Sequence, residues 1–448
     1  MTDPRPKLSW SDLAGARVGI WGLGREGQAN LRKLLALGVE PVLVDDAPAG
    51  SALPIPGGRP VLATADGGLA ALQRCDVVVK TPGLSRYRPE VAHLSGRGIP
   101  VVGGLGLWLA EADLRRVLCV TGTKGKSTTS SLTGHLLTGL GYRCLVGGNI
   151  GAVPYDPDNA GDVDYWVIEV SSYQATDLPV SPPVVAVTSL HPDHLDWHGG
   201  VEQYYRDKLS ACSQPGAELT VANGDSAPLR EHAALLGPRV EWVSEHDDPA
   251  AAWMDPLGLP GRHNRRNALI ARRCLVALGV PGAADDDALR AAAAGYQPLP
   301  SRLTPVGAVG GVDFVDDSLS TNVLPTLAAL DAFPGRRIAL IVGGHDRGID
   351  YAPLAAGVVA RDAPTRVLTL PDSGPRIRTQ IEAAAPAPQS AFAGVADCAD
   401  LKTAVKAAFD WAKPDGVVLL SPAAPSFGVF KDYRDRGEAF AREVRALS

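Results

Sequence analysis

Short apolar runs and longer amphipathic segments alternate along the whole chain. The runs at 16–22, 41–46 and 76–83 have the apolar, valine-rich content of buried parallel strands. Between the first two lies GQANLRKLLALG (27–38), whose apolar residues have helical spacing and which ends on a glycine. The chain up to about residue 113 is therefore expected to form a small open α/β sheet.

The same alternation continues in two further series. Apolar strands are expected in the second series at 115–122, 164–172, 184–190 and 218–225, and in the third at 311–318, 336–344, 365–370 and 416–424. A helix at 262–279 ends on Gly279, and the segment GYQPLPSRLTP (295–305) has the proline and glycine content of a boundary. We predict three α/β domains in series, at 1–113, 114–299 and 300–448.

Composition narrows the class of protein. Apolar residues make up 45% and charged residues 21%, as in ordinary globular proteins, and a net charge of −6 without a basic run argues against nucleic acid as a partner. The six cysteines form no C-x-x-C pair, which fits a reducing cytoplasm. The N-terminus is polar and no apolar run approaches the roughly 20 residues of a membrane span, so we expect a cytoplasmic protein without membrane insertion.

The segment TGTKGKSTT (121–129) is close to the phosphate-binding pattern G-x-x-x-x-G-K-[ST], although Val120 stands where the first glycine is usual. It follows an apolar run and precedes a predicted helix, which is the context that the motif requires. Backbone amides would surround phosphate oxygens, Lys126 would reach the β- and γ-phosphates, and the hydroxyl of Ser127 or Thr128 would offer an oxygen to Mg²⁺. The predicted nucleotide contacts are Gly122, Thr123, Lys124, Gly125, Lys126, Ser127 and Thr128. The alternative is a capped helix with a solvated lysine.

A second glycine-rich loop, GLGREG at 22–27, also lies between an expected strand and an expected helix. It matches G-x-G-x-x-G, and Asp45 closes the next strand, where a dinucleotide-binding fold places an acidic residue. The loop alone leaves three interpretations open. It could bind NAD, it could bind another diphosphate such as a uridine diphosphate, or it could be a tight turn without a ligand.

Further polar groups follow the strands of the second series. Glu169 ends an apolar strand, where a buried carboxylate is costly unless it meets a cation. The stretch SLHPDHLDWHGG (189–200) holds three histidines and two aspartates, and Lys208 lies on an expected helix. In the absence of C-x-x-C pairs, Mg²⁺ bound through oxygens is favoured over zinc. A polar surface loop is the alternative for each histidine taken alone.

Seven motifs together resemble the Mur ligases and occur in the order found in that family. They are GTKGKST, GGNIG (147–151), EVSSYQ (169–174), DHLDWH (193–198), GRHNRRNALIA (261–271), DDSLSTN (316–322) and LSPAAPSFGVFKDYRDRGEAF (420–440). The resemblance spans the chain and implies an N-terminal Rossmann-like UDP-binding domain, a central ATPase domain and a C-terminal Rossmann-like domain that binds the amino acid. It is strongest to the branch that adds glutamate to UDP-N-acetylmuramoyl-L-alanine in peptidoglycan synthesis.

The resemblance also implies ligands and residue roles. ATP and two Mg²⁺ ions are the implied cofactors, and Lys208 matches a lysine that the family carbamylates. The catalytic group would be Lys126, Glu169, His194 and Lys208, and the metal ligands would be Ser127, Glu169, His194 and the Lys208 carbamate. Asn267, Arg302 and Asp317 would contact the adenine nucleotide. The UDP-linked substrate would be held by Gly22, Leu23, Gly24, Arg25, Asp45, Thr81, Pro82, Gly83, Asn149 and Ser171. Glutamate would be held by Thr321, Arg347, Ser426 and Tyr433.

The chain departs from the family pattern mainly in the third domain. Leu319 stands where the D-glutamate-adding enzymes carry a lysine, and Gly428 stands where they carry an acidic residue. Inverting the acceptor's α-carbon requires its cationic partners to be rearranged. Leu319 and Gly428 resemble a variant branch of the family that adds L-glutamate, and this resemblance implies L-glutamate as the acceptor and an epimerase that acts later in the pathway. The alternative is that the acceptor is still D-glutamate and that these substitutions accumulated around an unchanged pocket.

Three other classes of protein share some of these sequence features. Folylpolyglutamate synthases share the central motif, but they carry an extra glycine before the hydroxyl residue and lack the N-terminal domain. An interpretation as an NAD-dependent dehydrogenase would rest on the GLGREG motif alone. A non-catalytic nucleotide-binding protein would have lost Lys208 and the metal ligands, which are present. We expect a monomeric enzyme.

Overall fold

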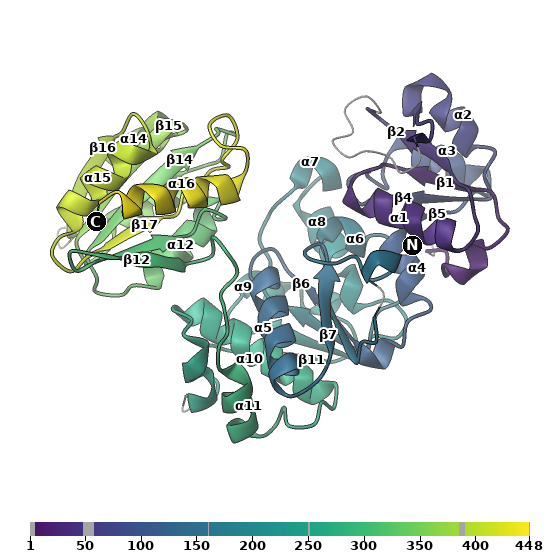
Figure 1. The fold of residues 1–448 in the computed structure, drawn as a ribbon, viewed down its shortest axis with the longest axis horizontal. Coiled ribbons are helices and arrows are strands. Elements are labelled where there is room, and N and C mark those ends of the chain that lie inside the picture. The colour runs from purple at the N-terminus through teal and green to yellow at the C-terminus, as the bar shows by residue number, and fades with distance from the viewer. Residues whose placement is uncertain (1–4, 48–57, 160, 250, 385–389, 448) are drawn as a thin grey trace. The chain divides into compact units, whose positions relative to one another are not determined.

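The computed structural model describes residues 5–47, 58–159, 161–249, 251–384 and 390–447. These residues form three sheets flanked by helices (Figure 1), so the expected α/β fold with three domains in series is confirmed. Two compact units contain them: Met1–Leu257 with Arg266–Tyr296, and Gly258–Arg265 with Gln297–Ser448. The first unit holds two of the sheets and the second unit holds the third. The boundaries at 113 and 299 stay predictions.

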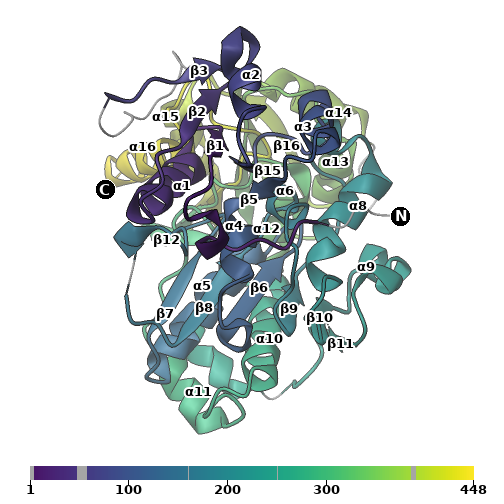
Figure 2. The ribbon, with the colours of Figure 1, turned by 90° about the vertical axis from the view of Figure 1, so that its right-hand side faces the viewer.

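The first sheet is wholly parallel, with the order β3-β2-β1-β4-β5. Its strands are β1 (Val18–Trp21), β2 (Val42–Asp45), β3 (Leu62–Ala63), β4 (Val77–Lys80) and β5 (Val101–Gly103). Apolar residues of α1 (Arg25–Ala36) pack on one face, and those of α2 (Leu69–Leu72) and α3 (Pro89–Gly96) pack on the other. Figure 2 shows α1 and α3 on opposite sides of β1. Helix α4 (Gly104–Leu109) follows β5.

The second sheet is also parallel, with the order β11-β10-β9-β6-β8-β7. Its strands are β6 (Val117–Thr121), β7 (Cys144–Gly148), β8 (Tyr165–Glu169), β9 (Val184–Val187), β10 (Leu219–Asn223) and β11 (Val240–Val243). The helices of this part are α5 (Lys126–Gly139), α6 (Ser172–Ala175), α7 (Leu195–His198), α8 (Val201–Leu209), α9 (Ala227–Glu231), α10 (Arg262–Ala277) and α11 (Asp286–Ala293). One hydrophobic cluster runs from Ile20 of the first sheet to Val187 of the second, so the two sheets share a core.

The third sheet, in the second unit, has the order β12-β13-β17-β14-β15-β16. Among the described strands of this sheet, only β12 (Thr304–Val309) pairs antiparallel, with β13 (Val312–Asp316). The other strands are β14 (Ile338–Gly344), β15 (Thr365–Asp372), β16 (Phe392–Asp397) and β17 (Val417–Leu420). Helices α12 (Val323–Asp331), α13 (Ala352–Val359) and α14 (Gly374–Ala383) bury one face, and α15 (Leu401–Ala412) and α16 (Tyr433–Arg445) bury the other.

The sheet orders fix where ligands can bind. In an open parallel sheet, the crevice lies beyond the carboxyl ends of the strands, at the point where the strand order reverses. In the first sheet this point lies between β1 and β4, and in the second it lies at β6. The loops that follow these strands carry the glycine motifs at 22–27 and 121–129.

Candidate active site

The phosphate-loop motif joins β6 to α5 and ends in a left-handed turn. Gly125 is the N-cap of α5, with φ of +92°. A Cβ atom at this position would lie 3.1 Å from Asn267 Oδ1 and 3.2 Å from Thr188 Cβ. Glycine is therefore required both by the backbone conformation and by the close neighbours. Asn267, one of the predicted nucleotide contacts, is 5% exposed and lies against the loop.

The residues that follow β9 form hydrogen bonds with the phosphate-loop motif. The Thr123 N–H donates to Ser189 O (2.9 Å), the Lys124 N–H donates to Ser189 Oγ (2.8 Å), and Thr188 Oγ1 donates to Lys124 O (2.6 Å). Sequence reasoning missed both Thr188 and Ser189, because nothing in the stretch VTSL distinguishes them from strand residues. These contacts preorganise the loop backbone before any ligand arrives.

Two lysine side chains converge on one carbonyl oxygen of the loop. Lys126 Nζ donates to Gly122 O at 2.9 Å, and Lys208 Nζ, from α8, donates to the same oxygen at 3.0 Å. Lys208 is 2% exposed and its Nζ lies 5.0 Å from the centre of the Tyr204 ring. Burial, together with the charge of Lys126, holds the pKa of Lys208 well below its ordinary value. Lys208 is thus suited to exist as a neutral amine.

Glu169 has the contacts expected of a cation ligand. It ends β8 and is 1% exposed. Oε1 accepts a hydrogen bond from Asn149 Nδ2 (2.7 Å), whereas the buried Oε2 has no hydrogen-bond partner among the described residues. A buried, unpaired carboxylate oxygen is costly, and a bound divalent cation would remove that cost. The described residues contain no cluster of three or more His, Cys, Asp or Glu side chains, so hydroxyl, phosphate or water oxygens would have to complete such a site.

The histidine-rich stretch divides into two environments. His194, which precedes α7, has φ of +52° and a half-exposed side chain, and partial burial lowers its pKa. Next to it, Asp193 accepts from Lys124 Nζ at 3.3 Å. His198 is instead 3% exposed, and its ring nitrogens lie 2.6 Å from Asp207 Oδ2 and 3.0 Å from Ser172 Oγ. Both ring nitrogens of His198 therefore already have partners, and His194 alone of this pair was predicted as a metal ligand, which stays a prediction.

The GLGREG loop contacts both its own sheet and the central one. A Cβ atom on Gly22 would lie 2.1 Å from Thr81 Oγ1, so the loops after β1 and β4 touch. Asp45 Oδ2 accepts from the Leu23 N–H at 2.8 Å. Arg25 donates to three backbone oxygens of the GGNIG segment, those of Gly148 (2.8 Å), Asn149 (2.9 Å) and Gly151 (3.0 Å).

The other predicted substrate contacts lie at strand or helix ends. Pro82 and Gly83 follow β4, and Gly24 precedes α1. Ser171 caps α6 through a 3.1 Å bond from the Gln174 N–H to Ser171 Oγ.

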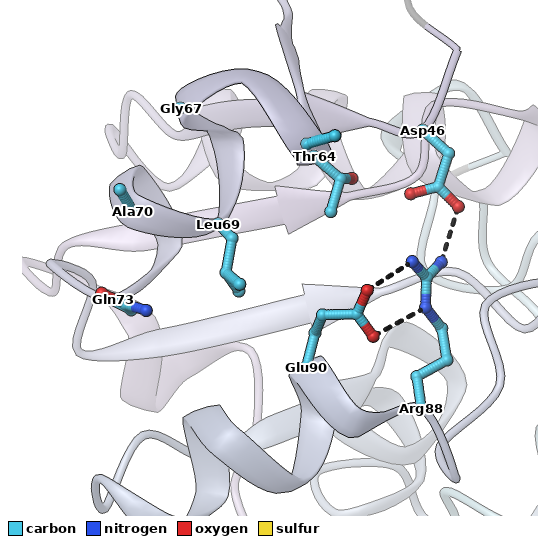
Figure 3. A pocket seen from close by; sticks show the side chains of 9 residues that line it. Asp46, Thr64, Gly67, Leu69, Ala70, Gln73, Arg88 and Glu90 are labelled. Atoms are coloured by element: carbon cyan, nitrogen blue, oxygen red, sulfur yellow. Dashed lines mark hydrogen bonds and ion pairs between the residues drawn. The ribbon is translucent and has the colours of Figure 1, made fainter.

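A cavity of about 580 Å³ adjoins the end of β2 (Figure 3). Arg88 crosses it, donating to Asp46 (2.6 Å) and Glu90 (3.1 Å) and lying 4.9 Å from the centre of the Trp21 ring. Thr64, Leu69 and Gln73 are among the remaining lining residues. Sequence reasoning missed this cavity, although Asp46 directly follows the predicted Asp45. Its lining offers a guanidinium and two carboxylates.

The remaining candidate residues belong to the second unit. Asp317 and Ser426 are buried, whereas Arg302, Thr321 and Tyr433 are half-buried and Arg347 is exposed. The contact between Arg347 Nη2 and Thr321 O is long, at 3.5 Å. Leu319, which stands where the D-glutamate-adding enzymes carry a lysine, is half-buried and uncharged.

Comparison with protein families identifies the chain. The model described as "Mur ligase middle domain" matches residues 120–275, and the one described as "Mur ligase, glutamate ligase domain" matches residues 301–424. A Micromonospora protein named UDP-N-acetylmuramoyl-L-alanine–L-glutamate ligase is 43% identical, with 97% of this chain and 98% of the relative covered. The chain belongs to the Mur ligase family. The resemblance inferred from the motifs, and the expectation of an enzyme of the ligase class, are confirmed.

Other relatives of this Mur ligase carry the same name. The protein from Salinispora tropica is 41% identical over 97% of this chain and 98% of the relative, and that from Xanthomonas axonopodis pv. citri is 38% identical over 96% of each.

Solved structures support the fold. UDP-N-acetylmuramate-alanine ligase MurC from Thermotoga maritima aligns over 97% of this chain and 100% of its own, with 17% identity and a TM-score of 0.56. Folylpolyglutamate synthase from Mycobacterium tuberculosis complexed with ADP aligns over 74% of this chain and 91% of its own, with 16% identity and a TM-score of 0.52. The full-length match is thus to a Mur ligase. Among the described residues of this Mur ligase, no helix combines the length and the apolar character needed to cross a membrane.

Proposed function

We propose that this Mur ligase uses ATP to join L-glutamate to UDP-N-acetylmuramoyl-L-alanine, a step of peptidoglycan precursor synthesis that takes place in the cytoplasm. The observation that carries the proposal is the name shared by relatives that are 38–43% identical over nearly the whole chain. The two lysines on the phosphate loop and the unpaired oxygen of Glu169 support the chemistry that the name requires.

A carboxylate is a poor electrophile, so the reaction must activate it. The alanine carboxylate oxygen attacks the γ-phosphorus of ATP, the bond from that phosphorus to the β-phosphate oxygen breaks, and ADP leaves. The glutamate amine then attacks the acyl carbon, phosphate leaves, and the nitrogen loses its proton. Lys126 and the amides at the start of α5 would stabilise charge on the transferring phosphoryl group.

Lys208 would act after modification. Its neutral amine attacks CO₂ and the nitrogen releases a proton, which gives a carbamate anion. This change places a negative charge near Lys126, whose Nζ shares Gly122 O with Lys208. Ser127, Glu169, His194 and the carbamate would then hold Mg²⁺, which when bound would neutralise phosphate charge during transfer.

The UDP-linked substrate would occupy the loops at the carboxyl end of the first sheet. Backbone amides of the GLGREG loop lie at the start of α1, a site that favours diphosphates. Arg25 supports the proposal because it ties this loop to Asn149 and the GGNIG segment of the central sheet. Asn149 in turn donates to Glu169, so the GGNIG segment is in direct contact with the proposed metal ligand.

The proposed acceptor residues belong to the second unit. Thr321, Arg347, Ser426 and Tyr433 are the proposed glutamate contacts. Leu319 contributes no cation there, so the acceptor's carboxylates would rely on Arg347 and on hydroxyl groups. An L-configured product implies an epimerase that acts later in the pathway.

The deciding experiment measures phosphate release from ATP with UDP-N-acetylmuramoyl-L-alanine and either L- or D-glutamate. We expect kcat/KM to be at least tenfold higher with L-glutamate, a difference of about 1.4 kcal/mol in transition-state binding. Leu319→Lys should reduce that ratio because it adds a charge to the acceptor pocket. Leu324→Lys, at a 41% exposed position on α12, is the matched control and should leave the ratio unchanged.

Each other outcome has a distinct meaning. A preference for D-glutamate would contradict the assigned acceptor while keeping the ligase. Turnover with neither amino acid, in protein that binds ATP, would contradict the ligase assignment itself.

A further inference from the structure

A hydrogen-bonded chain with a buried centre lies beside the phosphate loop, and no step of the proposed reaction uses it. Its centre is Asp207, which directly precedes Lys208 on α8 and is 5% exposed. Asp207 Oδ2 lies 2.6 Å from His198 Nδ1, and His198 Nε2 lies 3.0 Å from Ser172 Oγ. Asp207 Oδ1 accepts from Tyr87 Oη at 2.6 Å and from Gln203 Nε2 at 2.9 Å.

The hydrogen-bond roles in this chain follow from its chemistry. An ionised Asp207 can only accept, so His198 Nδ1 carries the hydrogen that lies between them. In the neutral ring, Nε2 is then the acceptor for the Ser172 hydroxyl. Each group is satisfied, which is the condition under which a buried polar network rigidifies its surroundings.

Aromatic rings hold the histidine in place. The Tyr173 and Trp197 rings stack with their centres 4.5 Å apart, and the His198 ring lies 4.4 Å from that of Trp197 and 5.6 Å from that of Tyr173. Tyr204 packs edge-on against His198 at 5.2 Å and donates to or accepts from Thr123 Oγ1 at 3.0 Å. His198 therefore has little freedom to leave Asp207.

The residues of this hydrogen-bonded chain lie close in sequence to residues of each part of the proposed site. Ser172 follows Ser171, a proposed substrate contact, and lies three residues after Glu169. Asp207 is followed by Lys208, whose Nζ reaches the phosphate loop. Tyr87 lies four residues after Gly83, whose backbone oxygen accepts from Trp197 Nε1 at 3.3 Å. One carboxylate thus connects segments that carry the proposed substrate, metal and carbamate groups.

We propose that Asp207 and His198 are positioning residues that hold Lys208 at the phosphate loop and, through Tyr87, tie it to the substrate loop at 81–83. This inference rests on the proposed carbamate role of Lys208. Without the carboxylate, residue 207 could no longer accept hydrogen bonds from Tyr87 and His198 at the same time, and Lys208 would no longer be presented to CO₂ and to Gly122 O in a single orientation.

The test compares Asp207→Asn with Glu202→Gln, which makes the same change from carboxylate to amide at an exposed position of α8. The enzyme is supplied with ¹³C-bicarbonate, the carbamate resonance is recorded by NMR, and steady-state kinetics are measured with ATP and UDP-N-acetylmuramoyl-L-alanine. We expect Asp207→Asn to lose most of the carbamate signal and to lower kcat by about 10- to 100-fold, with KM for ATP nearly unchanged. Glu202→Gln should match the wild type in all three measurements.

A second variant separates positioning from folding. Tyr87→Phe keeps the ring and removes only the hydroxyl that reaches Asp207. It should raise KM for the UDP-linked substrate, and the double variant with Asp207→Asn should be no worse than Asp207→Asn alone, because both changes break the same connection. A purely structural role would lower Tm and leave the carbamate signal and kcat of the folded enzyme intact, and that result would overturn the inference. A wild-type enzyme that turns over without a carbamate signal would overturn the role of Lys208 and this inference with it.

Discussion

Asp317 is a carboxyl group buried at the carboxyl end of β13. Its Oδ2 accepts from Ser421 Oγ at 2.7 Å and its Oδ1 accepts from the Leu303 N–H at 3.2 Å. Burial outweighs these bonds and raises the pKa of Asp317 to about 7. The folded protein therefore holds a proton that the unfolded chain releases near pH 4.

The pH dependence of stability follows from this shift. The stabilisation by the bound proton is fully present below pH 4 and is lost as the pH rises through 7, and linkage gives it a magnitude of roughly 4 kcal/mol. Asp317→Asn stays neutral at every pH. We expect its Tm to exceed that of the wild type by more at pH 8 than at pH 5. Asp415→Asn, at an exposed position of the same unit, is the control. A Tm difference that does not vary between pH 5 and pH 8 would contradict the assigned pKa.

Residue identities were more predictable than residue contacts. Glu169 and Lys208 could be singled out, because a carboxylate at the end of an apolar strand and a lysine after a histidine-rich loop are unusual in sequence. His194 and His198 lie four residues apart in one histidine-rich stretch, yet the fold buries the His198 ring and leaves the His194 ring half-exposed. That difference depends on Asp207 and Ser172, which pack against His198 from other segments.

The elements that were most predictable from the sequence are the buried parallel strands. The predicted runs at 41–46 and 184–190 contain β2 and β9 within them, because strands buried on both faces are apolar throughout. Strand β12 was missed: it is antiparallel, half-exposed and begins in the proline-rich segment that indicated a boundary. Its sequence alternates too weakly to be distinguished from a linker.

Helix α5 offers a matched pair of glycines for testing the phosphate loop. Gly125 at its start and Gly141 just beyond its end have nearly the same φ, +92° and +93°. A Cβ atom meets Asn267 and Thr188 at Gly125 but nothing within 4 Å at Gly141. Alanine at either position should cost about 1–2 kcal/mol of backbone strain.

Only the change at the loop should affect nucleotide binding. We expect Gly125→Ala to raise the Kd for ATP at least tenfold and Gly141→Ala to leave it unchanged, as measured by calorimetry on folded protein. Equal Kd values for the two variants would show that the loop at 121–129 does not hold the nucleotide.

At the scale of the whole molecule, the first and second sheets are joined by a buried ion pair. Lys80, at the end of β4, is fully buried and pairs with Asp177, whose side chain is 7% exposed. Removing one partner of such a pair leaves an uncompensated charge and typically costs about 3–5 kcal/mol, whereas replacing both can be nearly neutral.

The pair therefore predicts a pattern across three variants. Lys80→Met should lower the free energy of unfolding of the first unit strongly, and Lys80→Met with Asp177→Leu should recover most of the loss. Arg143→Gln, which breaks an exposed pair with Asp164, should change it by less than about 1 kcal/mol. Urea unfolding followed by tryptophan fluorescence measures all three. A double variant as unstable as Lys80→Met would contradict the assigned pairing.

The shared core of the first two sheets also limits how this chain could have been assembled in evolution. Tyr155 of the central part donates to Asn30 of α1 at 2.8 Å, and its ring lies 5.0 Å from that of Trp10. An N-terminal sheet grafted from a distant relative would meet this surface with the wrong side chains, so recombination at residue 113 would yield poorly folded chimeras. Both sheets of the first unit would have to be exchanged together to keep these contacts, so we expect the unit to change over evolution by point substitution rather than by replacement of one sheet.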